Sequence, residues 1–314
     1  MSRIFVLGNA SIDTTLLVPR LPVAGETLMA TGILRAPGGK GLNQAVMAAR
    51  AGAEVQFLAP LGDEPETALI RNAVAAEGLA ASWMQTGAPT DLSSLMVAPD
   101  GENCIVSTGA CCDALGMEPA LGFVAGLSPG DVLLMQGNLL LDVTLAAARA
   151  ARARGGRVML NTAPLRWDFS ELLPLCDLVV ANRFEARAIT GHDTSGIAAQ
   201  ALAGAGAAVV TLGAAGCVLA DPAIQTFAAE PAAAVDTTGA GDVFCGVLAA
   251  SWAAGAALPV AIARAQRAAA ISVGRAGCFG AFPTRAELGS DAKQIRRGLR
   301  PSTPPRAKPL EPYT

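Results

Sequence analysis

The sequence has 314 residues, a net charge of −3 and a hydrophobic content of 52%. A chain of this length buries a sizeable core, while its slight acidity and its aromatic content of only 4% argue against binding to nucleic acid or to an anionic membrane surface. Seven cysteines without a C-x-x-C spacing and a single histidine, His192, argue against disulfides, a zinc centre and a histidine triad, and favour free thiols in a cytoplasmic protein.

Short apolar runs alternate with alanine-rich helical patterns along most of the chain. Helices are predicted at 41–53, 66–78, 142–156 and 183–191, and strands at 3–9, 54–62, 131–138, 157–164, 176–182 and 207–213. Continuous apolar strands separated by helices predict an α/β fold, in which a mostly parallel sheet has helices on both faces. Ligands of such sheets bind beyond the carboxyl ends of the strands, where we expect four asparagines to share a crevice: Asn9, Asn138, Asn161 and Asn182.

Two stretches, residues 13–37 and 91–110, interrupt this alternation because they carry β-type patterns and no helical one. The second stretch reads as two strands joined by a turn at Asp100–Gly101. We expect either a small β-sheet that acts as a lid or ordinary surface hairpins. Residues 1–297 then form one domain with these stretches inserted, and the tail at 298–314, with five prolines, is predicted to be disordered.

Residues 243–263 carry no charged side chain and are numerous enough for a membrane span. The segment contains Gly246, Gly255 and Pro259 and follows the acidic Asp242 directly, so we predict two buried helices there instead. The start of the chain has neither an apolar core nor a small-residue cleavage site, so no signal peptide is predicted.

Two glycine-rich stretches precede helical patterns, at residues 36–45 and 235–246. The first lacks the spacing of a Walker A loop, yet it places polar side chains at a helix entry, where a polyol or a phosphate can bind. In the second, Gly239, Ala240 and Gly241 leave backbone N–H groups bare at a helix start, which suits an anion. Asp242 in the same turn would repel that anion, so we infer that a bound group loses a proton there.

Asn182 and Glu185 lie three residues apart where a predicted strand enters a helix. This spacing is typical of a helix cap, and the same oxygen atoms suit Mg²⁺ and its waters. The two residues alone leave both interpretations open.

Together these stretches resemble the ribokinase family of sugar kinases, also called the PfkB group, over roughly residues 3–290. The segment GGKGLNQA at 38–45 is similar to the N-terminal signature of the family, and DTTGAGDVFCG at 236–246 is similar to its C-terminal one. The Asn182-x-x-Glu185 pair matches a third family element. The resemblance implies a ribokinase-like fold with a small β-sheet lid, and ATP-dependent phosphorylation of a hydroxymethyl group on a small sugar.

The resemblance also implies a role for each matching residue. Asp242 takes the proton from the sugar hydroxyl that attacks the γ-phosphate, and the amides of Gly239, Ala240 and Gly241 hold the phosphoryl charge. The implied sugar contacts are Ser11, Asp13, Gly39, Lys40, Asn43 and Asn138. The residues implied for Mg²⁺-ATP are Asn182, Glu185, Thr211, Gly213, Gly216 and Gln266. Those implied for K⁺ are Asp236, Thr238, Ser272, Arg275 and Gly277, although Ala281 stands where the family has a further serine ligand.

The resemblance leaves the substrate open. Ser11 stands where ribokinases have an asparagine and Asn138 where they have a carboxylate, and one lost buried partner rejects a substrate by about tenfold or more. Ribose is the leading candidate, with fructose, 2-keto-3-deoxygluconate and nucleosides as alternatives. A nucleoside needs an apolar lid surface for its base, for which the candidates are Leu95, Val97, Ile105 and Val106. A non-catalytic sugar sensor is the alternative outside the enzymes, and a homodimer through the lid is a further expectation.

Overall fold

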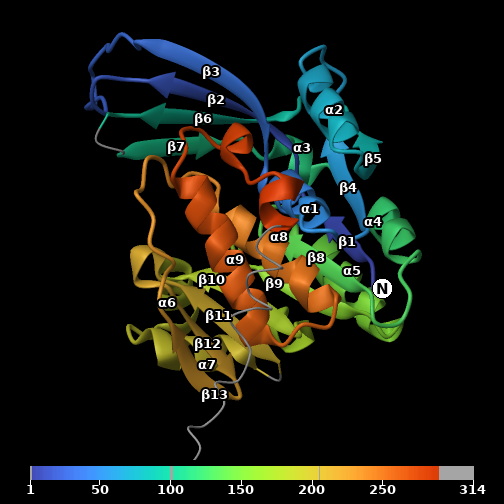
Figure 1. Cartoon of the computed structure of the whole chain (residues 1–314). Coiled ribbons are helices and arrows are strands. Elements are labelled where there is room, and N and C mark those ends of the chain that lie inside the picture. The colour runs from blue at the N-terminus through green and yellow to red at the C-terminus, as the bar shows by residue number, and fades with distance from the viewer. Residues whose placement is uncertain (1, 100–101, 205, 290–314) are drawn as a thin grey trace, which may run out of the picture.

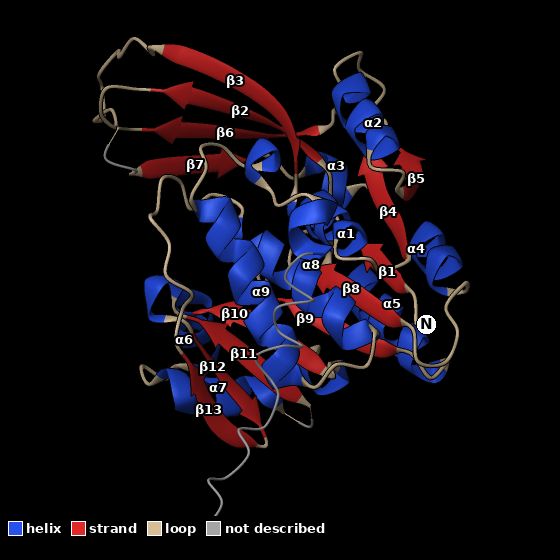
Figure 2. Ribbon diagram, in the orientation of Figure 1, coloured by secondary structure: helices blue, strands red, loops and turns tan. Residues whose placement is uncertain are grey.

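The computed structural model describes residues 2–99, 102–204 and 206–289, so the predicted turn at 100–101 and the predicted disordered tail at 298–314 lie outside the described residues. Its main sheet has nine strands (Figures 1 and 2). In chain order they are β1 (Ile4–Leu7), β4 (Val55–Leu61), β5 (Ala80–Gln85), β8 (Val132–Gln136), β9 (Arg157–Asn161), β10 (Leu178–Asn182), β11 (Ala207–Thr211), β12 (Cys217–Asp221) and β13 (Ala223–Phe227).

The strands lie in the order β13-β12-β11-β10-β9-β8-β1-β4-β5. Every neighbouring pair is parallel except the two pairs made by β12, which runs antiparallel to both β11 and β13. The predicted mostly parallel α/β sheet is therefore confirmed. The carboxyl ends of its parallel strands lie along one edge, which makes that edge the expected place for a ligand.

Helices cover both faces of this sheet. One hydrophobic cluster includes α1 (Lys40–Arg50), α2 (Thr67–Ala76), α8 (Ala240–Ala253) and α9 (Leu258–Val273). The other includes α3 (Ala110–Asp113), α4 (Met117–Val124), α5 (Leu141–Ala153), α6 (Arg183–Thr190) and α7 (Ser195–Ala203). Along β1, Ile4 and Val6 join the first cluster while Phe5 and Leu7 join the second. This double burial explains why the strand reads as a continuous apolar run.

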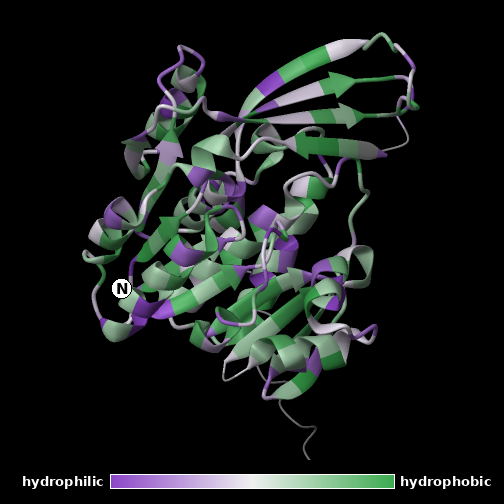
Figure 3. Ribbon diagram, turned by 180° about the vertical axis from the view of Figure 1, so that it is seen from behind, coloured by the Kyte–Doolittle hydropathy of each residue, from purple (hydrophilic) through white to green (hydrophobic). Residues whose placement is uncertain are grey.

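A second sheet, which we call the lid sheet, projects from the top of the main body in Figure 1. Its four strands lie in the order β3 (Gly32–Gly38), β2 (Ser11–Leu17), β6 (Asp91–Val97) and β7 (Asn103–Ser107). The lid sheet confirms that the two inserted β stretches come together. Figure 3 shows hydrophobic residues along its strands, and four of them are at least half exposed: Ile33, Leu34, Ile105 and Val106.

Helices α8 and α9 confirm the predicted helix pair at 243–263. They pack against each other, and α8 also packs against α1. Within the described part of the chain, no helix combines the length and apolar character that crossing a membrane requires.

Candidate active site

Both glycine-rich stretches begin helices, as predicted. Gly39 precedes α1 with a φ of 96°, and Gly239 precedes α8 with a φ of 77°, a backbone region that favours glycine. A Cβ atom on Gly39 would lie 2.8 Å from Cα of Ala10, and one on Gly239 would lie 2.6 Å from Sγ of Cys278. Close packing as well as backbone conformation therefore requires glycine at both positions.

Asp242 is the acidic residue in the first turn of α8, and it is only 5% exposed. Its Oδ2 accepts a hydrogen bond from Nδ2 of Asn43 at 3.1 Å, and its Oδ1 accepts one from Nε2 of Gln44 at 3.0 Å. Nζ of Lys40 lies 3.7 Å from Oδ1. Lys40, Asn43 and Gln44 have the spacing that places side chains on one face of a helix, so α1 presents all three to the carboxylate.

Lys40 supplies positive charge to this site. The nearby Asp242 carboxylate raises the pKa of the Lys40 ammonium group, with a smaller contribution from Glu185, and so keeps it protonated at neutral pH. About 36% of the Lys40 side chain is exposed, so the ammonium group remains accessible to a ligand.

The start of α8 offers unpaired backbone N–H groups. Within the described residues, neither Gly239 nor Gly241 donates its N–H to any acceptor, while Ala240 donates to the carbonyl of Thr237 at 3.3 Å. A Cβ atom on Gly241 would meet nothing within 4 Å, so the space beside it is open. Two free amides, the positive end of a helix and Lys40 together suit an anionic group.

Asp13 faces this site from the lid sheet. Its Oδ1 accepts a hydrogen bond from the hydroxyl of Ser11 at 2.9 Å, and Ser93 lies opposite it on the paired strand β6. Burial raises the pKa of the Asp13 carboxyl, although the hydrogen bond from Ser11 opposes the shift. A Cβ atom on Gly38 would lie 2.1 Å from the carboxylate, so glycine is required there too.

The Ser93 hydroxyl also pairs with that of Ser107 at 3.0 Å, which extends a row of polar groups across the lid sheet from β2 through β6 to β7. Gly38, which packs against the Asp13 carboxylate, is followed directly by Gly39 and Lys40, so the lid sheet brings Asp13 beside the start of α1. Of the predicted sugar contacts, Ser11, Asp13, Gly39, Lys40 and Asn43 therefore lie in one region.

The four asparagines lie at the carboxyl edge of the sheet, but three of them support its framework. Oδ1 of Asn9 accepts the N–H of Gly41 at 3.1 Å, Asn161 bonds other buried groups, and Asn182 caps α6. Asn138 differs, because its Oδ1 is buried without a hydrogen-bond partner among the described residues. Its backbone carbonyl accepts a hydrogen bond from Arg166. Asn138 alone of the four keeps a free buried acceptor for a ligand.

Asn182 and Glu185 form a capping box at the start of α6. The Asn182 side chain accepts the N–H of Glu185 at 2.9 Å, and Oε2 of Glu185 accepts the N–H of Asn182 at 2.9 Å. Oε2 also accepts the hydroxyl of Thr162 at 3.0 Å. The helix-cap interpretation is thus confirmed, while the Mg²⁺ interpretation stays a prediction. Among the described residues, no three His, Cys, Asp or Glu side chains are grouped so as to hold a metal ion.

The predicted nucleotide contacts gather near the end of β11. Thr211 is its last residue, and Gly213 and Gly216, both with positive φ, flank the following 3₁₀ turn (Gly213–Ala215). Nε2 of Gln266 on α9 lies 3.7 Å from Sγ of Cys217, directly after Gly216. Gln266 therefore belongs to the same region.

The predicted cation ligands surround Asp236. Its carboxylate accepts the N–H groups of Thr238 at 2.9 Å and Gly277 at 3.0 Å. Oγ1 of Thr238 and Oγ of Ser272 are buried and have no hydrogen-bond partner among the described residues. The guanidinium group of Arg275 pairs instead with Glu287, which leaves only the backbone carbonyl of Arg275 for a cation.

The structure adds residues that the sequence did not indicate. Gln44 contacts Asp242 directly, and behind it lie Gln136, which was not predicted, and Asn161, which was expected at this edge of the sheet. The available signal was the position of Gln44, four residues after Lys40 and next to Asn43 on the same helix. Ser93 was missed because its contact with Asp13 depends on the pairing of β2 with β6.

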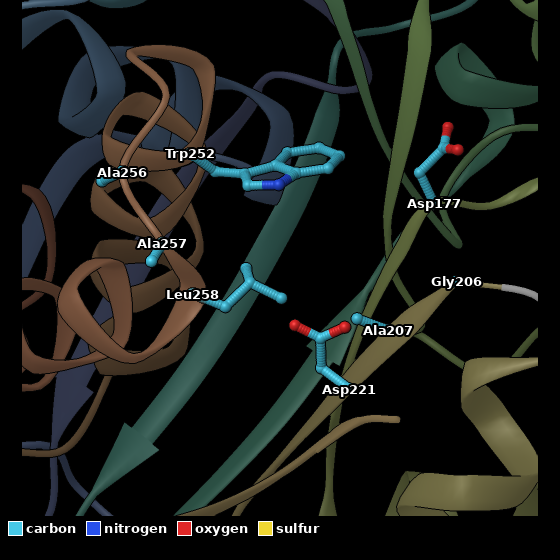
Figure 4. Close-up of a pocket in the computed structure, with 8 residues that line it drawn as sticks. All are labelled: Asp177, Gly206, Ala207, Asp221, Trp252, Ala256, Ala257 and Leu258. Atoms are coloured by element: carbon cyan, nitrogen blue, oxygen red, sulfur yellow. The ribbon is translucent and has the colours of Figure 1, made fainter. Parts of the chain in front are cut away.

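A pocket of about 370 Å³ lies at the opposite edge of the main sheet (Figure 4). Asp177 and Gly206 precede β10 and β11, and Asp221 ends the antiparallel β12, so all three mark the edge away from Asp242. Asp177 already pairs with Arg152 at 2.8 Å. The pocket contains none of the predicted site residues.

Comparisons with known proteins agree with this geometry. The family description "pfkB family carbohydrate kinase" matches residues 1–285. A ribokinase from Haemophilus influenzae is 34% identical over 295 residues, which are 90% of this chain and 95% of that protein. A mouse ribokinase is 31% identical over 305 residues, which are 91% of this chain and 94% of that protein.

Solved structures give the same result. The ribokinase of Thermotoga maritima matches with a TM-score of 0.84 and 27% identity, over 93% of this chain and all of that one. The Arabidopsis thaliana ribokinase, solved with ribose and ATP, matches with a TM-score of 0.81 and 27% identity, over 92% of this chain and 98% of that one. The chain therefore belongs to the pfkB family of carbohydrate kinases.

Proposed function

We propose that this protein phosphorylates the hydroxymethyl group of ribose with ATP, and that Asp242 is the base. The observation that carries the proposal is that the start of α8 holds the Asp242 carboxylate and the unpaired amides of Gly239 and Gly241, and that the Lys40 ammonium group on α1 lies 3.7 Å from that carboxylate. A base beside an anion site is the arrangement that phosphoryl transfer to an alcohol needs.

In the proposed step, the sugar hydroxyl oxygen forms a bond to the γ-phosphorus while the bond from that phosphorus to the bridging oxygen breaks. The hydroxyl proton passes to Asp242, and ADP leaves with the electron pair of the broken bond. The amides of Gly239, Ala240 and Gly241 stabilise the charge of the transferring group, and Lys40 adds a positive charge. Mg²⁺ bound with ATP would neutralise phosphate charge, and the Glu185 carboxylate would be a candidate partner for it.

Two observations favour a sugar over a nucleoside. The relatives at 34% and 31% identity are ribokinases. On the lid sheet, the residues beside Asp13 are Ser93 and then Ser107, which are polar. Of the apolar candidates for contact with a base, Leu95 is buried at 4% exposure, and the exposed Ile105 and Val106 lie farther from Asp13 along the sheet than Ser107 does. Hydroxyl groups pair with hydroxyl and carboxylate side chains, so this surface suits a polyol.

The test is ADP release with ribose, fructose, 2-deoxyribose, 2-keto-3-deoxygluconate and adenosine. We expect ribose to turn over fastest, and Asp242→Asn to lose about a hundredfold or more in kcat. Asp221→Asn, an exposed change at the far edge of the sheet, is the matched control and should keep wild-type activity. If another of the five compounds turns over faster than ribose, that compound replaces ribose as the proposed substrate. If none of the five turns over but ribose still binds, the sugar-sensor alternative is favoured.

We also infer a site for a monovalent cation beside Asp236. The buried, unpartnered hydroxyls of Thr238 and Ser272 support it, because such groups otherwise lack a partner. Ala281 contributes no side-chain oxygen, so backbone carbonyls would supply the remaining ligands. Activity in KCl compared with tetramethylammonium chloride tests the site, and equal rates in the two salts would count against it.

We further infer a cytoplasmic homodimer that forms through the lid sheet. All seven cysteines are free thiols, which suits a reducing compartment. Ile33 and Leu34 are adjacent on β3, and Ile105 and Val106 are adjacent on β7, so each strand exposes apolar side chains on both sheet faces. Sedimentation of the wild type and of Ile33→Ser tests whether this surface joins two copies.

A further inference from the structure

Gln44 is a fully buried side chain whose three hydrogen bonds the proposed reaction does not yet use. Its Nε2 donates to Oδ1 of Asp242 at 3.0 Å and to Oδ1 of Asn161 at 3.1 Å. Its Oε1 accepts a hydrogen bond from Nε2 of Gln136 at 2.9 Å. Both amide hydrogens are therefore used, and the carbonyl oxygen has a donor of its own.

The direction of these hydrogen bonds is fixed by a backbone group. The carbonyl of Val180 can only accept, so Asn161 must present its Nδ2 there, which it does at 3.2 Å. Oδ1 of Asn161 then faces Gln44 and requires a donor. A rotated Gln44 amide would place its oxygen against two acceptors, Asn161 and Asp242, and would lose the bond from Gln136 as well.

The Asp242 carboxylate is consequently held on both oxygens by amide donors that cannot accept a proton. Asn43 binds Oδ2 and Gln44 binds Oδ1. Amide donors on both oxygens fix the plane of a carboxylate. The proton of the acceptor hydroxyl can then pass to Asp242 but to neither amide.

We propose that Gln44 is a positioning residue for phosphoryl transfer, which holds the Asp242 carboxylate correctly turned through a directional chain that starts at the Val180 carbonyl and runs through Asn161. The inference rests on the proposed function, because it assumes that Asp242 is the base. It assigns to Gln44 no contact with sugar or nucleotide.

The experiment measures kcat, the KM for ribose and the KM for ATP at neutral pH for the wild type, Gln44→Met and Asp242→Asn. Methionine is close in size to glutamine but donates no hydrogen bond. We expect Gln44→Met to lower kcat by about tenfold or more with little change in the KM for ribose or the KM for ATP. With kcat counted per folded enzyme, such a split separates a positioning role from a general distortion of the site, which would not lower kcat alone.

Thr144→Val is the matched control for the loss of a buried hydrogen bond. Thr144 is fully buried on α5, on the other side of the sheet, and its hydroxyl donates to the carbonyl of Leu140 at 2.8 Å. We expect this change to lower the melting temperature without touching the site, so kcat and both KM values should match the wild type.

Asn161→Ala provides a second test if Gln44→Met does not fold. Asn161 contacts Asp242 through Gln44, so its removal should lower kcat in the same way with little change in either KM, and the double variant should resemble Gln44→Met. A folded Gln44→Met, or a folded Asn161→Ala in its place, with kcat within about twofold of wild type overturns the inference. Full activity in Asp242→Asn overturns the base assignment itself, which separates the two failures.

Discussion

Nδ2 of Asn43 donates a hydrogen bond to Oδ2 of Asp242 at 3.1 Å, although 199 residues separate them in the chain. The bond joins the two glycine-rich signatures, one at the start of α1 and one at the start of α8. Oδ1 of Asn43 is buried and has no partner among the described residues. The amide nitrogen of Asn43 thus donates to Asp242, the proposed base, while its amide oxygen stays free to accept a hydrogen bond. This combination suits a sugar hydroxyl.

Replacing Asn43 by alanine should therefore damage both binding and chemistry. We expect Asn43→Ala to raise the KM for ribose and to lower kcat, with a combined loss in kcat/KM of about a hundredfold. The KM for ATP should change little. Asn72→Ala, an exposed change on α2, is the matched control and should keep wild-type kinetics. A loss confined to kcat would show that Asn43 contacts Asp242 but not the sugar.

Gly239 and Gly241 offer a second comparison within the same turn. A Cβ atom on Gly239 would lie 2.6 Å from Sγ of Cys278 and 2.9 Å from the Phe282 ring, at a φ of 77°. Gly239→Ala should therefore lower the free energy of unfolding by about 1–3 kcal/mol and reduce kcat as the helix start shifts.

Gly241→Ala is the counterpart. The added methyl group would meet nothing within 4 Å, and Gly241 lies in the first turn of α8, so the fold should be preserved or stabilised by up to about 1 kcal/mol. Denaturation curves of both variants measure the stabilities. If Gly241→Ala keeps its stability but loses kcat, the open space beside Gly241 is where the phosphoryl group approaches. If its activity is unchanged, that space is not used.

How far the sequence predicts this molecule depends on whether a feature is local. The starts of α1 and α8 were predictable because glycine followed by a helical pattern is a local signal, and both begin within the expected stretches. Strands β5, β12 and β13 were not predicted. β5 and β13 lack a continuous apolar run because they are edge strands, and β13 is exposed along four of its five residues. β12 has a buried apolar run at 217–220, but no helical pattern separates it from β11 to mark it as a further strand.

The same distinction applies to the site. Asp242 and Asn43 belong to short motifs and were predicted as site residues. Gln44 lies in the same motif, but its role depends on Asn161 and Gln136, which the sheet brings to it from 117 and 92 residues away. Ser93 reaches Asp13 only because β2 and β6 pair in parallel. Contacts of this kind follow from strand order and register, which the sequence alone did not determine.

We expect the buried Asp13 carboxylate to lower the free energy of unfolding at neutral pH, while it serves the proposed binding of the sugar. Burial raises the pKa of this carboxyl, so the folded state disfavours the ionised form. This cost in stability is fully present above the folded pKa. It disappears as the pH falls toward the usual pKa of 3.8. Asp13→Asn should therefore be at least as stable as the wild type at pH 7. The advantage should shrink at pH 4, while the KM for ribose rises at least about tenfold. Thermal unfolding at both pH values measures the effect, and a variant that is less stable than wild type at pH 7 would contradict it.

Arg50, at the end of α1, is a further position at which the structure predicts a large loss of stability on substitution. Its guanidinium group pairs with Glu77, with Nε 3.0 Å from Oε2, and donates through Nη1 to the carbonyls of Phe282 and Pro283, each at 3.1 Å. The side chain is only 14% exposed. Because Phe282 packs beside Gly239, Arg50 fixes the segment that supports the start of α8.

Arg50→Met should lower the free energy of unfolding by about 2–3 kcal/mol, since it leaves two backbone carbonyls and a partly buried carboxylate without their donor. Arg149→Met is the matched control, because Arg149 pairs with Glu171 at 3.5 Å and both side chains are more than 60% exposed. An exposed pair contributes at most about 1 kcal/mol. Urea denaturation at pH 7 compares the two. Equal losses would mean that water replaces the Arg50 contacts as readily as those of a surface pair, and that the Phe282 segment is held by packing alone.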